Sequence, residues 1–294
     1  MSGLEPRART GKWRALIEQL EALGFQPSRG RGQNFLFDDA MLEAIASDAR
    51  LDGQTRVLEI GPGCGILTER LVARAPQVLA VELDPRLAGL TRRRLSGAAN
   101  LELIEGDALD GKHALHPEVV RWTADPAPWS LVANLPYSVG TPILVACSRL
   151  EHPPESMTVL LQAELVERIV AQPSGDAWGA VSAKLQLLYG AERVRRVGPQ
   201  MFWPRPKVDS AVARLVLRPN RPDAARVAEF DALVTHLFAQ RRKTLRSRLA
   251  DLLGDREAVQ ELCASLALDG GRRPEQLSVS ELAALSTAVG RLRG

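Results

Sequence analysis

The sequence predicts an α/β protein in which a parallel, doubly wound sheet precedes a smaller, all-helical C-terminal domain. Short apolar runs at residues 56–60, 78–81, 101–104 and 129–133 alternate with helical stretches. This alternation is typical of a parallel sheet covered by helices. Beyond residue 219 the apolar residues recur at helical spacing. Together the two patterns indicate two domains, and a chain of 294 residues is long enough to build them.

Composition and proline content place the predicted domain limits. Residues 1–31 form a basic N-terminal extension with a predicted helix over residues 12–23. Residues 32–218 form the α/β domain, and the proline-rich segment Pro219–Pro222 leads into a helical domain over residues 219–294. Within the helical domain the predicted helices cover residues 229–250 and 256–266, and the last begins at Ser280.

The overall composition excludes some classes of protein. It is 45% hydrophobic and 25% charged, which is typical of a globular protein, and no apolar run approaches the ~20 residues that span a bilayer. The N-terminus lacks the apolar core of a signal peptide, and the 3 cysteines are widely scattered, so we expect reduced thiols and a cytoplasmic protein. The pI of about 9.0 and the clustered arginines are compatible with a polyanion partner or simply with solubility.

Chemically capable residues stand at the carboxyl ends of four successive predicted strands. The first strand runs into a glycine turn with Gly61 and Gly63, the second ends at Glu82, the third is followed by Asp107, and the fourth ends at Asn134. Open α/β sheets bind ligands at this edge. Glycines let a ligand approach the backbone, a carboxylate at the second strand can hold both hydroxyls of a ribose, and an acidic side chain can meet an adenine edge.

The spacing of the glycine turn indicates which nucleotide is bound. Gly-x-Gly-x-Gly differs from the Gly-x-Gly-x-x-Gly pattern that holds the pyrophosphate of a dinucleotide. S-adenosylmethionine carries no phosphate, so its site needs close approach to the backbone more than anion binding. The four strand ends together therefore predict a methyltransferase that binds S-adenosylmethionine.

The segment Asn134-Leu135-Pro136-Tyr137 has the residue types that methylation of an exocyclic amine needs. The Asn134 side-chain carbonyl and the Leu135 backbone carbonyl can accept hydrogen bonds from the amine, and Tyr137 can stack on a flat base. By itself the segment is equally compatible with an ordinary turn, because asparagine and proline are common turn residues. The upstream glycine turn favours the catalytic interpretation.

Three further segments have both an ordinary structural interpretation and a functional one. Gln33 and Asn34 by themselves indicate a solvated loop, and the link over residues 112–128, with His113 and His116, favours a solvated loop over a metal site. The segment 201–210 predicts a rigid aromatic and basic loop, with Phe202 or Trp203 offering a face to a base.

The segment 241–248 carries 5 positive charges and no acid. It is either a solvated helix face or a phosphate-binding surface. With a nucleotide-modifying domain in the same chain, phosphate contact is the preferred interpretation. The predicted RNA-contacting residues, including those of the 201–210 loop, are Arg205, Lys207, Arg241, Arg242, Lys243, Arg246 and Arg248.

These motifs, taken in order, resemble the ribosomal RNA adenine dimethyltransferase family, and within it the small-subunit (16S) enzymes. The matching segments are Gly-Gln-Asn-Phe-Leu (32–36), Glu-Ile-Gly-Pro-Gly-x-Gly-x-Leu-Thr (59–68), Glu-Leu-Asp (82–84), Gly-Asp-Ala (106–108), Asn-Leu-Pro-Tyr (134–137), Phe-x-Pro-x-Pro-Lys-Val-Asp-Ser-Ala-Val (202–212), Arg-Arg-Lys-Thr-Leu-Arg (241–246) and Arg-Pro-Glu-x-Leu-Ser (273–278). Each is modestly specific, whereas the ordered set is very specific.

The resemblance implies a Rossmann-like methyltransferase sheet and assigns roles to particular residues. It implies cofactor contact by Asn34, Leu36, Gly61, Glu82, Asp107 and Asn134. It also implies that Tyr137 and Phe202 flank the target adenine. The expected substrate is two adjacent adenosines near the 3′ end of small-subunit ribosomal RNA, each receiving two methyl groups while the subunit assembles. We expect a monomer without a metal ion.

The sequence departs from the family pattern in two places, and three other functions compete with the one that the resemblance implies. Cys64 replaces a bulkier apolar residue in the glycine turn, and Ser138-Val139-Gly140 replaces an Asn-Ile-Ser type of sequence.

The rival functions are a large-subunit adenine methyltransferase of the antibiotic-resistance type, an NAD-dependent oxidoreductase, and a non-catalytic ribosome-assembly factor. The arginine-rich segment and Arg273-Pro274-Glu275 favour the small-subunit enzyme, and the glycine spacing disfavours the oxidoreductase.

Overall fold

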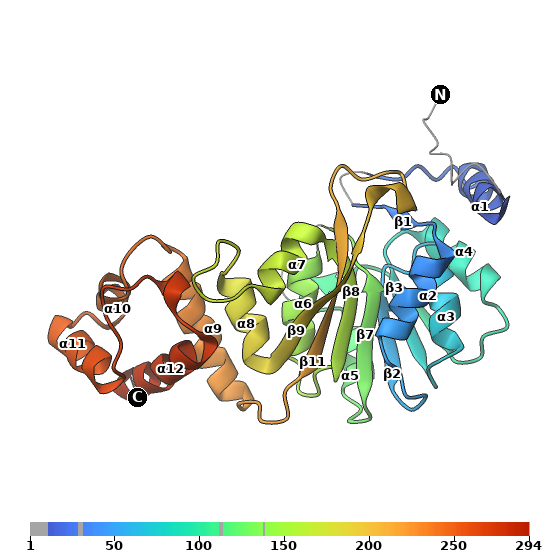
Figure 1. Ribbon diagram of the computed structural model, residues 1–294. Coiled ribbons are helices and arrows are strands. Elements are labelled where there is room, and N and C mark those ends of the chain that lie inside the picture. Colours follow the sequence, from blue (N-terminus) through green and yellow to red (C-terminus); the bar gives the residue numbers. More distant parts are fainter. Residues whose placement is uncertain (1–10, 29–31, 112–113, 138, 294) are drawn as a thin grey trace. The chain divides into compact units, whose positions relative to one another are not determined.

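The computed structural model describes residues 11–28, 32–111, 114–137 and 139–293 (Figure 1). The chain divides into two compact units. The first contains Met1–Val166 and Glu192–Val216, and the second contains Glu167–Ala191 and Leu217–Gly294. The predicted boundary at residue 219 lies close to the last of these limits. Residues 167–191, however, pack with the helical unit, although the predicted α/β domain included them.

A seven-stranded sheet has the strand order β4-β3-β2-β7-β8-β11-β9. Its strands are β2 (Arg56–Ile60), β3 (Val78–Glu82), β4 (Leu101–Glu105), β7 (Trp129–Asn134), β8 (Ser156–Gln162), β9 (Tyr189–Val197) and β11 (Ser210–Leu217). The four predicted strands, β2, β3, β4 and β7, are parallel to their neighbours, as is β8. β11 is antiparallel to β8, so the sheet is mixed rather than wholly parallel as predicted.

Both faces of the central strands are buried, which explains why their sequences are continuously apolar. Val57, Val78 and Val132 face one hydrophobic cluster, while the alternate residues Leu58 and Leu79 are also fully buried. The helices that follow the sheet strands in the first unit are α3 (Ile66–Val72), α4 (Pro85–Arg94), α5 (Pro117–Thr123), α6 (Gly140–Ser148) and α7 (Ala163–Val170). Helix α2 (Asp39–Asp48) precedes β2, and Asp38 caps it by accepting a hydrogen bond from Met41 N.

The strand order creates a switch point between β2 and β7. The chain proceeds from β2 outward through β3 to β4, then returns to place β7 on the other side of β2. The crevice at such a point lies beyond the carboxyl ends of the strands. β2 and β7 are parallel neighbours (Figure 1). The glycine turn after β2 and Asn134 at the end of β7 therefore lie at the same edge of the sheet.

In the described part of the predicted solvated loop, residues 114–128 form a short strand and a helix instead. β5 (Leu109–Asp110) pairs with β6 (Ala114–Leu115), and helix α5 follows. Trp122 is only 9% exposed because its ring meets Trp129 edge-on and the Arg56 guanidinium lies over it. His116 caps α5 by accepting from Glu118 N, whereas His113 lies outside the described residues. Among the described residues no cluster of His, Cys, Asp or Glu could hold a metal ion.

An aromatic stack attaches the predicted N-terminal helix, α1 (Gly11–Ala22), to the sheet unit. The ring of Trp13 stacks on Phe37 at 5.0 Å between centroids, and Phe37 stacks on Trp203 at 6.0 Å. Two short strands that were not predicted, β1 (Phe35–Leu36) and β10 (Phe202–Trp203), pair beside this stack. This pairing joins the segment that contains Phe35 and Leu36, called the N-terminal loop below, to the 201–210 loop.

The second unit is helical apart from the start of β9. Its helices are α8 (Ala180–Leu188), α9 (Ala224–Phe238), α10 (Leu245–Leu253), α11 (Arg256–Ser265) and α12 (Val279–Arg293). The single helix predicted over 229–250 is wrong, because α9 ends at Phe238 and Thr244 caps a new helix by accepting from Ser247 N. The split lets Phe230 and Leu245 both enter one buried cluster. No helix in the described part of the chain is long and apolar enough to cross a membrane.

Arg56 is the buried cation on which the β2–α5 packing depends. Its guanidinium donates to the carbonyl oxygens of Trp122 (3.2 Å), Asp125 (2.9 Å) and Ala127 (2.8 Å). Arg56→Met keeps an apolar stem but leaves these carbonyls without a donor, so we expect the free energy of unfolding to fall by about 3 kcal/mol in urea denaturation. The control is Arg121→Met, which removes an exposed ion pair with Glu118 on α5 and should lower the free energy of unfolding by under about 1 kcal/mol. Equal losses would contradict the assignment.

Candidate active site

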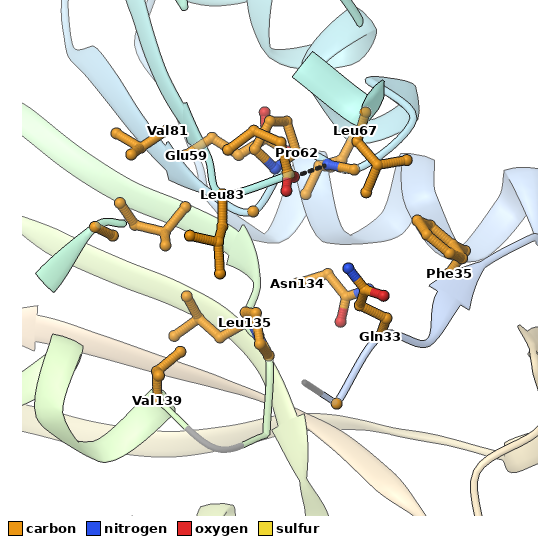
Figure 2. A pocket seen from close by; sticks show the side chains of 18 of the residues that line it. Gln33, Phe35, Glu59, Pro62, Leu67, Val81, Leu83, Asn134, Leu135 and Val139 are labelled. Carbon is orange, nitrogen blue, oxygen red and sulfur yellow. Dashed lines mark hydrogen bonds between the residues drawn. The ribbon is translucent and has the colours of Figure 1, made fainter. Parts of the chain in front are cut away.

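A cavity of about 240 Å³ opens at the carboxyl ends of β2, β3, β4 and β7. Figure 2 shows Gln33 and Asn134 reaching into it from different segments of the chain. Every predicted cofactor-binding residue lies in its wall, as do the residues of the Asn-Leu-Pro-Tyr turn: Asn34, Leu36, Gly61, Gly63, Glu82, Asp107, Asn134, Leu135, Pro136 and Tyr137. The structure thus brings together residues that are widely separated in the sequence.

The glycine turn needs glycine for both conformation and space. Gly61 and Gly63 have φ angles of 70° and 60°, in the left-handed region that favours glycine. A Cβ atom on Gly63 would lie 3.0 Å from the Phe35 ring. The backbone of the turn is therefore exposed to the cavity and held closely against the β1 segment, and a ligand can approach it directly.

Glu82 holds the glycine turn in place. Its Oε2 accepts a hydrogen bond from Gly63 N at 2.9 Å, and its Oε1 accepts from Asp84 N at 2.9 Å. The side chain is 5% exposed. Burial raises the pKa of Glu82, while the two backbone N–H groups oppose the rise. The carboxylate thus fixes the end of β3 against the end of β2 and presents oxygen acceptors to the cavity.

The Asn134 amide has a defined orientation. Its Nδ2 donates to the Asn34 carbonyl at 3.2 Å, and Asn34 Nδ2 in turn donates to the Gly32 carbonyl at 3.2 Å. A backbone carbonyl can only accept, so the amide nitrogen of Asn134 must face it. The side-chain oxygen is consequently turned away from Asn34. Leu135 N donates to Leu160 O at 3.1 Å, which continues the pairing with β8 into the turn.

Tyr137 is held at both ends of its side chain. Its hydroxyl lies 2.7 Å from Ser210 Oγ. Burial raises the pKa of Tyr137, so the phenol stays protonated near neutral pH. At the backbone, a Cβ on Gly32 would lie only 2.9 Å from Tyr137 N, which shows how closely the N-terminal loop packs on the turn.

Two side chains in the cavity wall were not singled out from the sequence. Gln33 was treated as part of a solvated loop, but its Oε1 accepts from Ser28 N at 2.8 Å and it lines the cavity. Glu59, the residue before Ile60 and the glycine turn, is 1% exposed and also lines the cavity. The feature of the sequence that could have identified Glu59 is its position at the end of a predicted strand, next to the glycine turn. Among the described residues its Oε2 has no hydrogen-bond partner.

Burial favours the neutral forms of Glu59 and Cys64. Burial raises the pKa of Glu59 to about 8, the Thr68 hydroxyl opposes the rise, and the charge of Glu82 adds to it. Burial likewise raises the pKa of Cys64 to about 12. Cys64 is therefore a neutral thiol at neutral pH, which is unsuited to act as a nucleophile.

Two residues with predicted contacts are buried in the structure. Phe202, expected to flank the target adenine, is 2% exposed and is not one of the described residues that line the cavity. Its backbone pairs with Leu36, so it supports β1. Arg248 is 5% exposed because its guanidinium pairs with Asp251 and donates to His236 O inside the helical unit. The other predicted RNA-contacting side chains are exposed: Arg205, Lys207, Arg241, Arg242, Lys243 and Arg246.

Fold and cavity together define a class of enzyme. The glycine cradle, which a Cβ would fill, the buried carboxylate at the end of β3 and the unpartnered Glu59 oxygen fit an adenosine carrying a methionine-derived sulfonium. This Rossmann-like sheet with its Asn-Leu-Pro-Tyr turn is that of an S-adenosylmethionine-dependent methyltransferase, as the sequence predicted.

Comparison with known proteins narrows the class. The family model "Ribosomal RNA adenine dimethylase" matches residues 25–285. "Ribosomal RNA small subunit methyltransferase A" of Geobacillus thermodenitrificans is 38% identical over 277 residues, covering 92% of this chain and 94% of that protein. The chain therefore belongs to the ribosomal RNA adenine dimethylase family, as its motifs predicted.

Two solved structures share the fold. The 23S ribosomal RNA methyltransferase ErmE is 27% identical with a TM-score of 0.66, covering 87% of this chain and 99% of that one. A dimethyladenosine transferase from Plasmodium falciparum is 21% identical with a TM-score of 0.68, covering 88% of this chain and 98% of that one. The second likeness supports the fold alone.

Glu59 should make stability depend on pH. Its pKa of about 8 in the folded chain lies above the ordinary 4.5, so the native state binds this proton more tightly than the unfolded chain does. The stabilising contribution is complete below about pH 4.5 and is lost progressively as the pH rises through about 8. Wild type should therefore lose stability relative to Glu59→Gln between about pH 5 and pH 8 in urea denaturation. Glu102→Gln, at an exposed site on β4, should show no such trend. A pH-independent difference for Glu59→Gln would refute the buried-acid interpretation.

Proposed function

We propose that this chain transfers methyl groups from S-adenosylmethionine to the N6 amines of two adjacent adenosines near the 3′ end of small-subunit (16S) ribosomal RNA. Each adenosine receives two methyl groups while the small subunit assembles in the cytoplasm, and the enzyme acts as a monomer. The observation that carries the proposal is the orientation of Asn134, whose amide nitrogen is held by Asn34 O so that its carbonyl oxygen is available to an amine.

The proposed cofactor contacts follow the strand ends. Gly61 and Gly63 present their backbone to the adenosylmethionine, and Glu82 accepts hydrogen bonds from the ribose hydroxyls. Asp107, whose Oδ1 accepts from Leu109 N at 2.9 Å, meets the adenine edge at the end of β4. Asn34, Leu36 and Asn134 complete the wall on the side of the N-terminal loop. When bound, the cofactor supplies an electrophilic methyl group on a sulfonium.

The residues of the turn carry out the reaction by positioning the acceptor. The N6 lone pair of adenine is delocalised into the ring, so the amine is a poor nucleophile. Asn134 Oδ1 and the Leu135 carbonyl accept its N–H hydrogens and hold it in line with the methyl group. They also stabilise the positive charge that develops on nitrogen, as does the face of Tyr137. The methylated cation is acidic and loses its proton to solvent afterwards.

Tyr137 supplies the stacking face for the extruded base. A base inside a duplex or stack cannot reach the cavity, so the target adenosine must leave its neighbours. Stacking on an aromatic ring offsets part of that cost. Because Phe202 is buried, the proposal assigns the stacking face to Tyr137 alone. The Tyr137 phenol takes no proton in the reaction, since burial raises its pKa.

Exposed cations in both units are proposed to hold the RNA backbone. Arg205 and Lys207 lie in the loop that leads to β11, and Arg241, Arg242 and Lys243 lie between α9 and α10. Lys and Arg side chains supply the salt-dependent, sequence-independent part of RNA binding. The small-subunit substrate is favoured over a large-subunit one because the relative with the small-subunit name is 38% identical, against 27% for the 23S enzyme.

Asn134→Ala tests the proposed mechanism. It removes the amine-orienting carbonyl and leaves the stacking ring, so the single-turnover rate of methyl transfer should fall by on the order of a hundredfold or more. Binding of unmethylated small subunits should barely change, because phosphate contacts carry most of the affinity. The measurement uses labelled S-adenosylmethionine, with the products resolved into mono- and dimethyladenosine.

Tyr137→Ala is the complementary variant in the same assay. It should weaken capture of the extruded adenine by about 1–3 kcal/mol while leaving Asn134 in place. Near-normal rates for both methylation steps in Asn134→Ala would show that Asn134 is only a turn residue. Normal subunit binding without any methylation by the wild-type chain would instead favour a non-catalytic assembly factor, and transfer only to large-subunit RNA would favour the rival substrate.

The cations between α9 and α10 should contribute to RNA affinity through charge alone. Replacing Arg241, Arg242 and Lys243 with glutamine should weaken subunit binding and flatten its salt dependence by about one unit of log–log slope for each lost phosphate contact. Cofactor affinity should not change. The charge-matched control replaces the exposed run Arg92, Arg93 and Arg94 at the end of α4. If both triple variants have the same salt slope, the segment is an ordinary solvated surface.

A further inference from the structure

We infer that Ser210 is a positioning residue for methyl transfer, because its hydroxyl fixes the direction of the Tyr137 side chain and so keeps the ring where the target base stacks on it. The inference rests on the proposed function, in which Tyr137 provides that stacking face. Ser210 ends the predicted 201–210 loop and belongs to the 202–212 motif, but neither the loop nor the family resemblance assigns it a role.

The contact itself is short and well protected from water. Ser210 Oγ lies 2.7 Å from the Tyr137 hydroxyl, and Ser210 is 0% exposed. Hydrogen bonds inside a protein are stronger than those exposed to water, and a buried hydroxyl that loses its partner is costly. Tyr137 is only partly buried, so its ring is accessible from the cavity while its tip is anchored.

Ser210 is held rigidly by the sheet. It begins β11, which pairs with β8 in a register that sets Ser210 opposite Gln162. Ala163 N also donates to Asp209 O at 2.9 Å, so the backbone on the N-terminal side of Ser210 is fixed as well. The hydroxyl is therefore presented from a part of the chain that does not depend on the turn carrying Tyr137.

Two fixed points define the direction of the ring's long axis. The backbone at Tyr137 is confined by Gly32, where a Cβ would lie 2.9 Å from Tyr137 N. A tyrosine held only at its backbone can still rotate about two side-chain bonds. The hydroxyl oxygen lies on the axis of rotation of the second bond, so a hydrogen bond at the far end of the ring restricts the first rotation, about Cα–Cβ, and fixes the direction of the ring. A ring already in place loses less entropy when the base arrives.

A second hydroxyl pair in the same sheet provides a matched control. Ser130 Oγ and Ser156 Oγ lie 2.9 Å apart, both residues are buried, and they sit directly opposite each other on β7 and β8. Ser130 is near the start of β7, whereas Asn134 ends that strand. Removing this pair tests what the loss of a buried hydroxyl contact does to the sheet without touching the turn.

The experiment compares Ser210→Ala, Tyr137→Phe, the double variant and Ser130→Ala. Each of the first two should lower the single-turnover rate of methyl transfer about tenfold, with subunit affinity and S-adenosylmethionine affinity unchanged. The double variant should be no slower than either single variant, because both changes remove one shared contact. Ser130→Ala should leave the rate unchanged, whatever it does to the urea midpoint.

The outcomes separate this inference from the proposed function. A normal rate in Ser210→Ala and Tyr137→Phe, with Tyr137→Ala still impaired, would overturn the role of Ser210 alone. A normal rate in Tyr137→Ala would overturn the stacking role of Tyr137 and the inference with it. Multiplying effects in the double variant, or a loss of rate in Ser130→Ala as large as in Ser210→Ala, would show that the hydroxyl acts only through sheet stability.

Discussion

The buried carboxylate of Glu82 is the interaction on which the site depends. It ties Gly63 N to Asp84 N, and so joins the turn after β2 to the turn after β3. Gly63 in that position packs against the ring of Phe35, which in turn stacks on Trp203. The Glu82 side chain thereby positions the glycine turn at the base of the cavity and, through Gly63, the Phe35 ring in its wall. Its cost in desolvation is offset by the two backbone donors, which also keep its oxygens aimed along the strand ends.

The turn that holds the acceptor amine is positioned by segments outside it. Asn34 holds the amide of Asn134, Ser210 holds the hydroxyl of Tyr137, and the Pro136 ring packs over Gly61. No side chain in the turn titrates near neutral pH, which suits a reaction that depends on alignment rather than on proton removal. The rigidity comes from backbone carbonyls and hydroxyls, groups whose charge does not vary with pH.

Local pattern was enough to predict the central strands and the glycine turn, because each depends on residues adjacent in sequence. Asn34 and Leu36 of the cavity wall were implied only by the family resemblance. Long-range packing explains the first two differences from the predictions, and short-range contacts explain most of the rest. Residues 114–128 do not form a solvated loop because Trp122 meets Arg56 and Trp129, a contact that no local pattern contains. Phe202 is buried because its strand pairs with β1. The helix predicted over 229–250 divides because Thr244 can cap a helix, and Arg248 is drawn inward by Asp251 and His236.

The pairing of β1 with β10 has a consequence for how the protein is made. All the residues that line the cavity lie between Gly32 and Ile143, so they leave the ribosome well before Phe202 and Trp203 do. Until those two residues emerge, the Phe35 segment lacks its partner strand and the rings that stack on it. Contacts between residues so distant in sequence form late. A nascent chain with every lining side chain already synthesised would therefore still lack the finished wall, and cofactor binding would begin only once β10 had joined β1.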